Sequence, residues 1–540
     1  MHIVGLSRLS DRVVGRVLSE QAQFAGDATW LMSDDTTVTF SQARQLVSRI
    51  AATLSGFGVG RGDVVAMHMD ASINLVLTGI GASELGARFA PMSTDYHGEF
   101  LQRNVQASTA QVLIADAYLA QRYAGLPDLG QVRHLVVTGD ADLSALRRPG
   151  LEVHAWDELL SSEPMPTPSV ANYDDVLMMW WSSGTTGAPK GIMQTHAGLM
   201  RSASYWIADR DIRDDEVWYS CLPMYLGGAW TMAVWPSLVS GTAAGIDPRL
   251  SVSRFWDRVR HYRATQIFSL GAMHMFLMQA PERPDDRDHA VRCAVPVPMP
   301  WSEVERFKER FGIKQVIQAY GQSEVPCRIF TAPDDGTPWR ANAAGRPVHW
   351  LDVRLVDDND EDVPVGEVGE IVVRPREPFV LFAGYFNAPE VTARTWRNLW
   401  HHTGDLARAE EDGQYFFADR KKDYIRYKGR NISMVEVEAV VAKHPQVADV
   451  AAFGRPSAEL ESEAELAICV VPRPDADLAA VGLARFINDN APYYFVPRYI
   501  EIASELPRNA QYKTDKVALR ERPVASDAWD RDLIDFKVER

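Results

Sequence analysis

The strongest signal in the sequence is SSGTTGAPKG, residues 182–191, which follows directly on the apolar run VLMMWW, residues 176–181. Glycines and hydroxyl side chains at this density form a loop whose backbone N–H groups can surround phosphate oxygens. Lys190 adds a positive charge, and Thr185 or Thr186 could reach a phosphate-bound Mg²⁺. This order of residues favours a phosphate-binding loop over a solvated linker.

The loop is not a Walker A motif. Pro189 precedes the lysine, and Gly191 follows it at the position where serine or threonine would stand. The loop residues that we expect to contact the nucleotide are Ser182, Ser183, Gly184, Thr185, Thr186 and Gly187.

Outward from this loop, helical patterns alternate with short β-branched runs over the first half of the chain. Residues 41–57 form an amphipathic helical pattern, and residues 64–69, 112–116 and 134–139 are predicted as strands. Such alternation favours parallel strands covered by helices. Residues 353–375 instead predict turn-rich antiparallel strands bounded by glycine and proline.

A basic, turn-prone stretch, RKKDYIRYKGRN at residues 420–431, separates two unequal parts. We predict an α/β fold with a large N-terminal domain over residues 1–420 and a small C-terminal domain over residues 421–540. Mixed and parallel sheets covered by helices, with a β-barrel-like subdomain, are expected in the large domain. The small domain is expected to be a mobile α+β unit with helices near residues 435–443 and 476–490.

Length, charge and cysteine usage limit the class of protein. The 540 residues are too many for one compact core, so at least two domains are expected. A net charge of −16 would repel nucleic-acid phosphates, so we expect no nucleic-acid partner. No apolar run reaches about eighteen residues, so we expect no membrane span. The four cysteines stand apart with no CxxC pair, which is typical of a reducing, cytoplasmic location.

Four further motifs follow in order along the chain. They are YGQSE at residues 320–324, TGD at 403–405, RKKD at 420–423 with KG at 428–429, and PRNAQYK at 507–513. Together with the phosphate loop they resemble the ANL superfamily of adenylate-forming enzymes, in particular its acyl-CoA synthetases. The resemblance covers nearly the whole chain, and it implies ATP, Mg²⁺ and coenzyme A as bound small molecules.

The resemblance also implies a role for each motif. The Tyr320 ring would stack on adenine, Glu324 and Thr185 would hold Mg²⁺, and the ribose would be bound by Asp405 and Arg420. Lys422 would be the pivot of the small domain. The implied catalytic residues are Lys513 and Lys190, and the remaining implied binding residues are Gly321 and Ser323 for the nucleotide and Gly429 and Arg430 for the CoA thiol.

The implied chemistry explains why such residues are needed. A carboxylate is a poor electrophile, and its attack on the ATP α-phosphate converts it to an acyl-adenylate with a good leaving group. The transition state is rich in negative charge, which Lys190, Lys513 and a Mg²⁺ on Glu324 would stabilise. A thiol then expels AMP, and the resemblance implies that the small domain rotates between the two half-reactions.

Three segments depart from the family pattern. Leu226 replaces a histidine in PMYL, residues 223–226, and VPV at residues 295–297 adds bulk to the expected adenine-binding loop. Tyr512 replaces a glycine before Lys513, where a bulky residue could misplace the lysine. A ligase that only thioesterifies an adenylate supplied by a partner ligase therefore stays open beside the full two-step enzyme.

The acid is expected to bind in a largely apolar pocket, with room for a bulky or ring-containing substrate. The predicted pocket residues are Tyr225, Leu226, Gly227, Trp230, Gly271 and Ala319. The sequence also resembles the carnitine- and crotonobetaine-CoA ligase branch, in which Trp230 could face a quaternary ammonium group. An apolar acid is the favoured prediction, and a core-packing role stays open for Trp230.

Other classes of protein share parts of this pattern. A freestanding adenylation enzyme could load a carrier-protein thiol, although nothing acidic stands near Leu226 to bind an amino group. A luciferase-like oxygenase shares the motifs, and a homodimer is compatible with all of these classes. A non-catalytic nucleotide-binding protein is least favoured, because the implied site residues are all present. His401 and His402 beside Asp405 could form a metal group, but the ribose motif already accounts for Asp405.

Overall fold

The computed structural model describes residues 2–165, 169–182, 190–270, 272–420, 424–427, 430–456, 464–491, 493–509, 513–533, 536 and 538. The chain divides into two compact units. Unit 1 comprises Met1–Asp352 and Arg374–Leu399, and unit 2 comprises Val353–Val373 and Trp400–Arg540. These units group residues 400–420 with the C-terminal part, and the boundary predicted after residue 420 stays a prediction.

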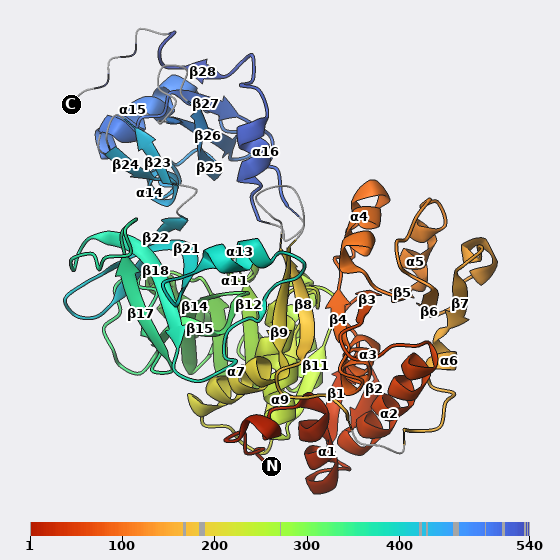
Figure 1. Ribbon diagram of the computed structural model, residues 1–540. Helices are drawn as coiled ribbons and strands as arrows, with labels where there is room; N and C mark the ends of the chain where they lie inside the picture. Colours follow the sequence, from red (N-terminus) through yellow and green to blue (C-terminus); the bar gives the residue numbers. More distant parts are fainter. Residues whose placement is uncertain are drawn as a thin grey trace. The chain divides into compact units, whose positions relative to one another are not determined.

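The strands on either side of the candidate phosphate loop, β8 and β9, belong to an eight-stranded sheet of unit 1 with the order β19-β9-β8-β4-β3-β5-β6-β7 (Figure 1). The pairs from β8 to β7 are parallel, as the alternating pattern predicts, whereas β8–β9 and β9–β19 are antiparallel. The strands are β3 (Val64–His68), β4 (Arg88–Pro91), β5 (Val112–Asp116), β6 (His134–Thr138), β7 (Glu152–Ala155), β8 (Val176–Ser182), β9 (Lys190–Thr195) and β19 (Gly384–Tyr385).

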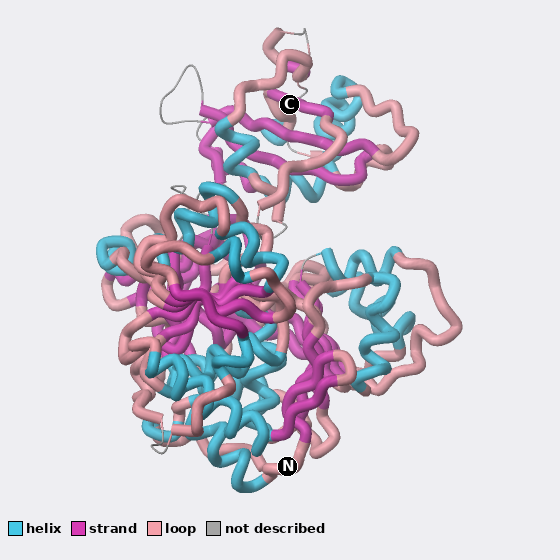
Figure 2. The backbone as a smooth tube through the Cα atoms, turned by 90° about the vertical axis from the view of Figure 1, so that its right-hand side faces the viewer, coloured by secondary structure: helices cyan, strands magenta, loops and turns pink. Residues whose placement is uncertain are grey.

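A nine-stranded sheet, also in unit 1, carries the YGQSE motif and has the order β16-β15-β14-β13-β12-β10-β11-β1-β2. Its central pairs from β14 to β1 are parallel, and both edges are antiparallel. The strands, drawn in magenta in Figure 2, are β1 (Thr29–Ser33), β2 (Thr36–Thr39), β10 (Val217–Ser220), β11 (Ala243–Ile246), β12 (Gln266–Leu270), β13 (Cys293–Val297), β14 (Gln315–Gln322), β15 (Val325–Pro333) and β16 (Arg346–Pro347).

Helices of unit 1 cover these sheets. The predicted helix at residues 41–57 is α2, and it begins with a capping box in which Thr39 and Gln42 satisfy each other's backbone N–H groups. The helices are α1 (Val14–Phe24), α2 (Phe40–Gly56), α3 (Ile73–Glu84), α4 (Gly98–Ser108), α5 (Ala117–Ala120), α6 (Trp156–Leu159), α7 (His196–Ala208), α8 (Gly227–Ala229), α9 (Trp235–Ser240), α10 (Phe255–Tyr262), α11 (Ala272–Gln279), α12 (Trp301–Phe311) and α13 (Pro389–Thr395).

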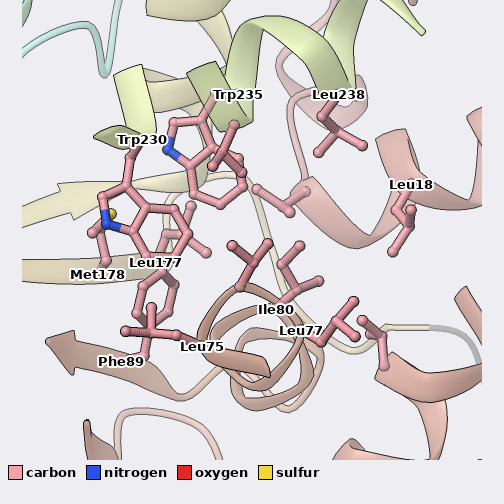
Figure 3. Packing of buried hydrophobic residues seen from close by; sticks show 14 of the residues in the cluster. Leu18, Leu75, Leu77, Ile80, Phe89, Leu177, Met178, Trp230, Trp235 and Leu238 are labelled. Atoms are coloured by element: carbon pink, nitrogen blue, oxygen red, sulfur yellow. The ribbon is translucent and has the colours of Figure 1, made fainter. Parts of the chain in front are cut away.

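The largest hydrophobic core of unit 1 joins residues of both sheets with α1, α2, α3, α7 and α9. Figure 3 shows Trp230 and Trp235 beside Phe89 of β4, with Leu75 and Ile80 of α3 nearby. Full burial of one such large apolar side chain contributes about 1.5–3 kcal/mol to folding. This core holds the strands that lead to the candidate loop in fixed positions.

Unit 2 contains antiparallel strands where the turn-rich pattern predicts them. In the five-stranded sheet that includes these strands, β18 pairs with β21 and β21 with β22. The α+β part that follows contains a β23–β24 hairpin and the sheet β25-β26-β27-β28. The strands are β17 (Leu351–Val356), β18 (Val368–Pro375), β21 (Trp400–Ala409), β22 (Tyr415–Arg420), β23 (Tyr424–Tyr427), β24 (Arg430–Ser433), β25 (Val447–Pro456), β26 (Ala464–Pro472), β27 (Tyr499–Ile502) and β28 (Trp529–Asp530), and β20 (Trp396–Arg397) falls within the residues of unit 1.

The helices of unit 2 lie close to their predicted positions. They are α14 (Met434–Val441), α15 (Ala480–Asn490) and α16 (Lys516–Glu521), and α14 and α15 pack on the strands in a core of their own. The predicted α/β fold with a large N-terminal and a small α+β C-terminal part is confirmed. Among the described residues, we find no helix with the length and hydropathy of a membrane span.

Candidate nucleotide and substrate site

The candidate phosphate loop joins two paired strands. β8 and β9 are antiparallel neighbours, and Ser182 lies opposite Lys190 in their register. The pairing therefore holds both ends of the loop close together. The loop residues Ser183, Gly184, Thr185, Thr186 and Gly187 lie outside the described residues.

Lys190 and Glu324 approach the same aromatic side chain. The Lys190 Nζ lies 5.8 Å from the centroid of the Tyr385 ring, and the Tyr385 hydroxyl donates a 2.7 Å hydrogen bond to Glu324 Oε1. Burial, together with the charge of Glu324, raises the pKa of Tyr385, so its hydroxyl keeps its proton at neutral pH. The structure thus brings together the predicted phosphate-binding lysine and the predicted metal-binding carboxylate.

Tyr385 was not predicted from the sequence, and its position depends on β19. The backbone of this strand pairs with β9, so that Tyr385 lies opposite Ile192. The Tyr385 N–H also donates a 2.9 Å hydrogen bond to Thr392 Oγ1 of α13. A glycine–aromatic pair before a helix with a proline at its start is the local signal that could have drawn attention to it. That signal does not say where the hydroxyl points, because the partner strand is far away in the sequence.

The YGQSE motif forms the turn between β14 and β15, where the register shifts between Tyr320 and Gln322. A Cβ at Gly321 would lie 3.0 Å from the Arg328 Cα, so a larger residue would push the two backbones apart by a few tenths of an ångström. The Ser323 carbonyl accepts a 2.6 Å hydrogen bond from the Gln194 side chain of β9. The Glu324 carbonyl accepts a 3.0 Å bond from the Phe382 N–H. The motif is therefore bonded to β9 through Gln194 and to the segment before β19 through Phe382.

Tyr320 and Ala319, at the end of β14, lie next to apolar groups. The half-buried Tyr320 ring stacks on Phe330, with the centroids 5.4 Å apart. Ala319 packs against an apolar cluster that also includes Val297 of the predicted adenine-binding loop. The other members of this cluster are Trp206, Met232, Phe268, Cys293, Val295 and Ile317.

Two buried arginines lie against Trp206 of this cluster. Their guanidinium carbons are 4.1 Å (Arg328) and 5.2 Å (Arg210) from the Trp206 ring centroid. Burial lowers the pKa of both groups, that of Arg328 to about 9, so Arg328 stays largely protonated at neutral pH. Arg328 also forms an ion pair with Asp209. The apolar cluster thus borders on positive charge.

The PMYL segment leads into the short helix α8. Tyr225 is buried, and Leu226 and Gly227 are half-buried. A Cβ at Gly227 would lie 3.0 Å from the indole ring of Trp180, so a larger residue at the start of α8 would displace this ring of β8 by a few tenths of an ångström. Gly271, the remaining glycine of the predicted pocket, lies outside the described residues.

Trp230 is a core residue of unit 1. It has no exposed surface, and its indole N–H donates a 2.7 Å hydrogen bond to the Met224 carbonyl. Its ring centroid lies 5.1 Å from that of Phe89 and 5.1 Å from that of Trp235 (Figure 3). The structure therefore agrees with the core-packing alternative for Trp230. Its contact with a substrate stays a prediction.

In unit 2, β21 and β22 bring together the two residues predicted to bind the ribose. Asp405 lies opposite Arg420 in the antiparallel register. Thr403 Oγ1 accepts a 3.1 Å hydrogen bond from the Asp405 N–H and donates a 2.7 Å bond to the Ile371 carbonyl. The Gly404 N–H donates to Glu370 Oε1 over 3.1 Å. These contacts fix the TGD turn locally.

The histidines before this turn have structural partners. His402 lies 3.3 Å from Glu370 and 3.6 Å from Asp360. His401 is buried, and burial and the neighbouring His402 lower its pKa to about 4. In the described part of the chain, His401 and His402 do not join Asp405 in a group of convergent metal ligands.

Lys513 is an exposed residue of unit 2. Its N–H donates a 3.0 Å hydrogen bond to Asn509 Oδ1, and its carbonyl accepts a 2.8 Å bond from the Asn509 N–H. Arg430 begins β24 and lies opposite Tyr427. The predicted pivot Lys422, the thiol-tunnel residue Gly429 and the unusual Tyr512 lie outside the described residues.

A lysine and a carboxylate near a glycine- and threonine-rich loop are typical of the active sites of enzymes that act on a nucleoside triphosphate. Family comparison narrows this class. The profile of AMP-binding enzymes matches residues 18–386, and that of the AMP-binding enzyme C-terminal domain matches residues 436–513. The chain belongs to the AMP-binding enzyme family. The predicted resemblance to ANL acyl-CoA synthetases is thereby confirmed.

Individual relatives match this chain over most of their length. The chain is 28% identical over 487 residues to a crotonobetaine/carnitine–CoA ligase of Salmonella paratyphi B, covering 89% of this chain and 93% of the relative. The o-succinylbenzoate CoA synthetase of Bacillus subtilis, solved with its acyl-adenylate, has a TM-score of 0.80 at 23% identity and 94% and 99% coverage. A benzoate CoA ligase from Burkholderia xenovorans LB400 has a TM-score of 0.80 at 22% identity and the same coverage.

Proposed function

We propose that this protein is an acyl-CoA ligase that works in two steps. A carboxylate oxygen attacks the α-phosphorus of ATP, the bond to the β-phosphate breaks, and pyrophosphate leaves. The sulfur of CoA then attacks the acyl carbon, the bond to AMP breaks, and the thiol proton passes to solvent. The observation that carries this proposal is the group formed by Lys190, Tyr385 and Glu324 beside the ends of the phosphate loop.

In the first step the chain neutralises and orients phosphate charge. Lys190 would contact the phosphates together with the loop residues 182–187, since a fixed ammonium stabilises charge that develops in the transition state. Glu324 fits Mg²⁺, because it is a half-buried carboxylate held in place by Tyr385 and because Mg²⁺ prefers oxygen ligands. Bound Mg²⁺, for which Thr185 is the second proposed ligand, would supply further charge neutralisation.

Residues of unit 2 complete the proposed machinery. The ribose hydroxyls would be held by Asp405 and Arg420, which their strand register supports. Lys513 would act in adenylation, whereas Gly429 and Arg430 would serve the thiol. The change between the two steps would be a rotation of the small domain about Lys422.

We propose as the substrate a carboxylic acid whose remaining part is uncharged and largely apolar. The cluster around Ala319 is lined by apolar side chains, and the buried Arg210 and Arg328 border on it. The guanidinium of Arg328, which is paired with Asp209, would disfavour the trimethylammonium group of carnitine-like acids, although relatives carry that name. The complete burial of Trp230 also removes the aromatic face on which cation binding was expected to depend.

The proposal is tested with a panel of carboxylic acids, ATP, Mg²⁺ and CoA, in which thioester is measured by mass spectrometry and pyrophosphate by a coupled assay. Aromatic and medium-chain acids are expected to give both products, and carnitine and crotonobetaine to give neither. Pyrophosphate without thioester would favour an enzyme that loads a carrier-protein thiol. Thioester formed only from a supplied acyl-adenylate would favour the thioesterification-only alternative. No turnover with any acid or adenylate would overturn the proposal.

We further propose a cytoplasmic location. All four cysteines are buried free thiols, which suits a reducing compartment. A homodimer stays a prediction from the sequence.

A further inference from the structure

Two histidines and a glutamate meet at the edge of the eight-stranded sheet, and the proposed reaction does not use them. His134 begins β6, and Glu152 and His154 lie on β7, the edge strand. In the parallel register His134 lies opposite Glu152, and His154 follows two residues later on the same face. Among the residues that the structure describes, no other group of three histidine, cysteine or acidic side chains converges in this way.

The three potential ligand atoms form a compact triangle. His134 Nδ1 lies 3.2 Å from His154 Nε2, and the Glu152 Oε2 lies 3.7 Å from the first and 3.8 Å from the second. Tetrahedral Zn²⁺ with bonds of about 2.0–2.1 Å places neighbouring ligand atoms about 3.4 Å apart. The spacings in the triangle therefore differ from this value by only a few tenths of an ångström, and an ion would replace the hydrogen bond between the two imidazole nitrogens.

The surroundings of His154 match those of a metal-binding histidine. Its Nδ1 lies 3.0 Å from Glu158 Oε2, while Glu158 Oε1 accepts a 2.9 Å hydrogen bond from the Ala155 N–H at the start of α6. A carboxylate on the second ring nitrogen fixes the orientation of the ring and directs the other nitrogen toward the ion.

An aromatic side chain holds both imidazoles from one side. The Phe57 ring stacks on His134 and on His154, with centroid distances of 4.5 Å in each case. The half-buried imidazoles are thus oriented by packing, whereas Glu152 is exposed to solvent. The cluster is therefore accessible to solvent from the Glu152 side.

We propose that His134, Glu152 and His154 form a transition-metal site that takes Zn²⁺ or an ion of similar preference. Two imidazole nitrogens and one carboxylate oxygen suit zinc, cobalt and nickel, whereas Mg²⁺ prefers oxygen ligands alone. The ion would cross-link β6 to the four-residue edge strand β7. In the sheet order this edge is opposite to β9 and β19, so the ion is expected to stabilise unit 1 without entering the reaction.

The test uses the untagged full chain and Zn²⁺ or Co²⁺ as the probe. Zinc binding is measured by isothermal titration calorimetry, and the coordination of Co²⁺ by its visible absorption. The variants are His134→Ala, His154→Ala, Glu152→Gln and Glu158→Gln. His97→Ala is the matched control, because His97 is an exposed histidine outside the cluster.

The wild-type protein and the control His97→Ala are each expected to bind one zinc ion more than His134→Ala or His154→Ala. Glu158→Gln is expected to weaken that binding about 10- to 100-fold, because a carboxylate that orients a ligating imidazole through its other ring nitrogen typically contributes this much. Zinc should raise the Tm of the wild type and not that of His134→Ala.

Equal zinc binding by the wild type and the histidine variants would overturn the proposal. Should a histidine variant fail to fold, Glu152→Gln decides, since this exposed, volume-conserving change keeps the sheet intact. An intense four-coordinate Co²⁺ spectrum that Glu152→Gln loses would support the site. A weak six-coordinate spectrum, or one that Glu152→Gln leaves unchanged, would overturn it.

Discussion

Tyr385 connects the two charged side chains on which the proposed adenylation depends in unit 1. Its hydroxyl donates to Glu324, and its ring faces the ammonium group of Lys190. A hydrogen bond to an ionised carboxylate is stronger than one between neutral groups, so it restricts the rotamers of Glu324. Tyr385 is therefore a positioning residue for the carboxylate that we propose as the Mg²⁺ ligand.

Tyr385→Phe removes this hydrogen bond and keeps the aromatic ring. We expect kcat to fall about tenfold and the Mg²⁺ concentration for half-maximal activity to rise, because a hydrogen bond to a charged group is worth about 1.5–3 kcal/mol. Steady-state kinetics at varied Mg²⁺ measure both effects. Tyr118→Phe is the matched control, since its hydroxyl also donates to a carboxylate, Asp70, over 2.9 Å. An equal loss in both variants would contradict a specific role for Tyr385.

Buried histidines make stability depend on pH. His196, at the start of α7, accepts a 3.2 Å hydrogen bond from the Val14 N–H of α1, and burial lowers its pKa from 6.5 to about 3. Below the unfolded pKa, the unfolded chain binds a proton that the folded protein excludes. Stability is therefore fully present above about pH 6.5 and falls as the pH is lowered toward 3, by up to about 1.4 kcal/mol per pH unit for this group.

His196→Asn keeps an acceptor for Val14 and removes the titrating ring. We expect a lower urea midpoint at neutral pH, because the smaller side chain leaves a cavity, but a smaller further loss at about pH 5. Tryptophan fluorescence during urea titration at each pH gives the midpoints. His97→Asn, at an exposed position, should leave the pH dependence of the wild type unchanged. The same result for His196→Asn would show that this group does not contribute.

At the scale of elements, the β14–β15 turn is the most constrained part of the candidate site. Gly321→Ala would place a Cβ 3.0 Å from the Arg328 Cα and 3.5 Å from the Val325 carbonyl oxygen, so the turn between Tyr320 and Glu324 must shift. We expect activity to fall up to about tenfold, because a shift of a few tenths of an ångström changes the positions of both side chains. Kinetics and Tm are measured together.

Gly482→Ala is the control for this change. Gly482 lies inside α15, where an added Cβ meets nothing within 4 Å, so alanine should stabilise the helix by about 0.5–1 kcal/mol and leave activity unchanged. An active Gly321→Ala enzyme with wild-type kinetics would show that the turn tolerates the shift.

Local patterns in the sequence located most elements but not their long-range pairing. The strand predicted at residues 112–116 is β5 with the same bounds, and α2 differs from its prediction by one residue at each end. These elements follow from hydrophobic periodicity and capping, which act over a few residues. The short strand β19 has no periodicity of its own, and it exists because it pairs with β9. For that reason Tyr385 was missed, and so was the meeting of His134 with His154 from two strands.

The site residues also fall into those that local motifs predict and those whose contacts depend on long-range packing. The phosphate loop, Glu324, Asp405 and Lys513 were expected from motifs, and the structure adds the contacts of Glu324 and Lys190 with the same side chain, Tyr385. Trp230 was predicted as a pocket residue because it follows the pocket motif PMYL in the sequence. Sequence does not reveal that its ring is enclosed by Phe89 and Trp235, because this packing joins β4 to η4 (Trp230–Val234) and α9.

At the scale of the whole molecule, the two units divide the proposed reaction between them. Lys190 and Glu324 belong to unit 1, whereas Asp405 and Lys513 belong to unit 2. A chain that carries out two chemically different steps in one protein can assign residues of its small domain to one step each. Under this scheme the loss of a residue used in one step should leave the other step intact.

Lys513→Ala tests this separation. We expect ATP-dependent pyrophosphate release to fall about 100- to 1000-fold, because a positive charge that stabilises the transition state is lost. Thioester formation from a supplied acyl-adenylate and CoA should stay within about twofold of the wild type, since Lys513 would not contact the acyl carbon in that step. Each half-reaction is measured alone, by pyrophosphate assay and by mass spectrometry.

Lys516→Ala provides the matched control, three residues along the chain. Its ammonium group lies 2.8 Å from Glu438, and an ion pair near the surface contributes only about 0–1 kcal/mol, so both half-reactions should persist. If Lys513→Ala lost both half-reactions equally while Lys516→Ala kept them, Lys513 would be needed for a common step, and the separation of the two steps between residues of unit 2 would be wrong. If Lys513→Ala kept full pyrophosphate release, its proposed part in adenylation would be wrong, and Lys190 with Glu324 would remain as the charged groups of that step.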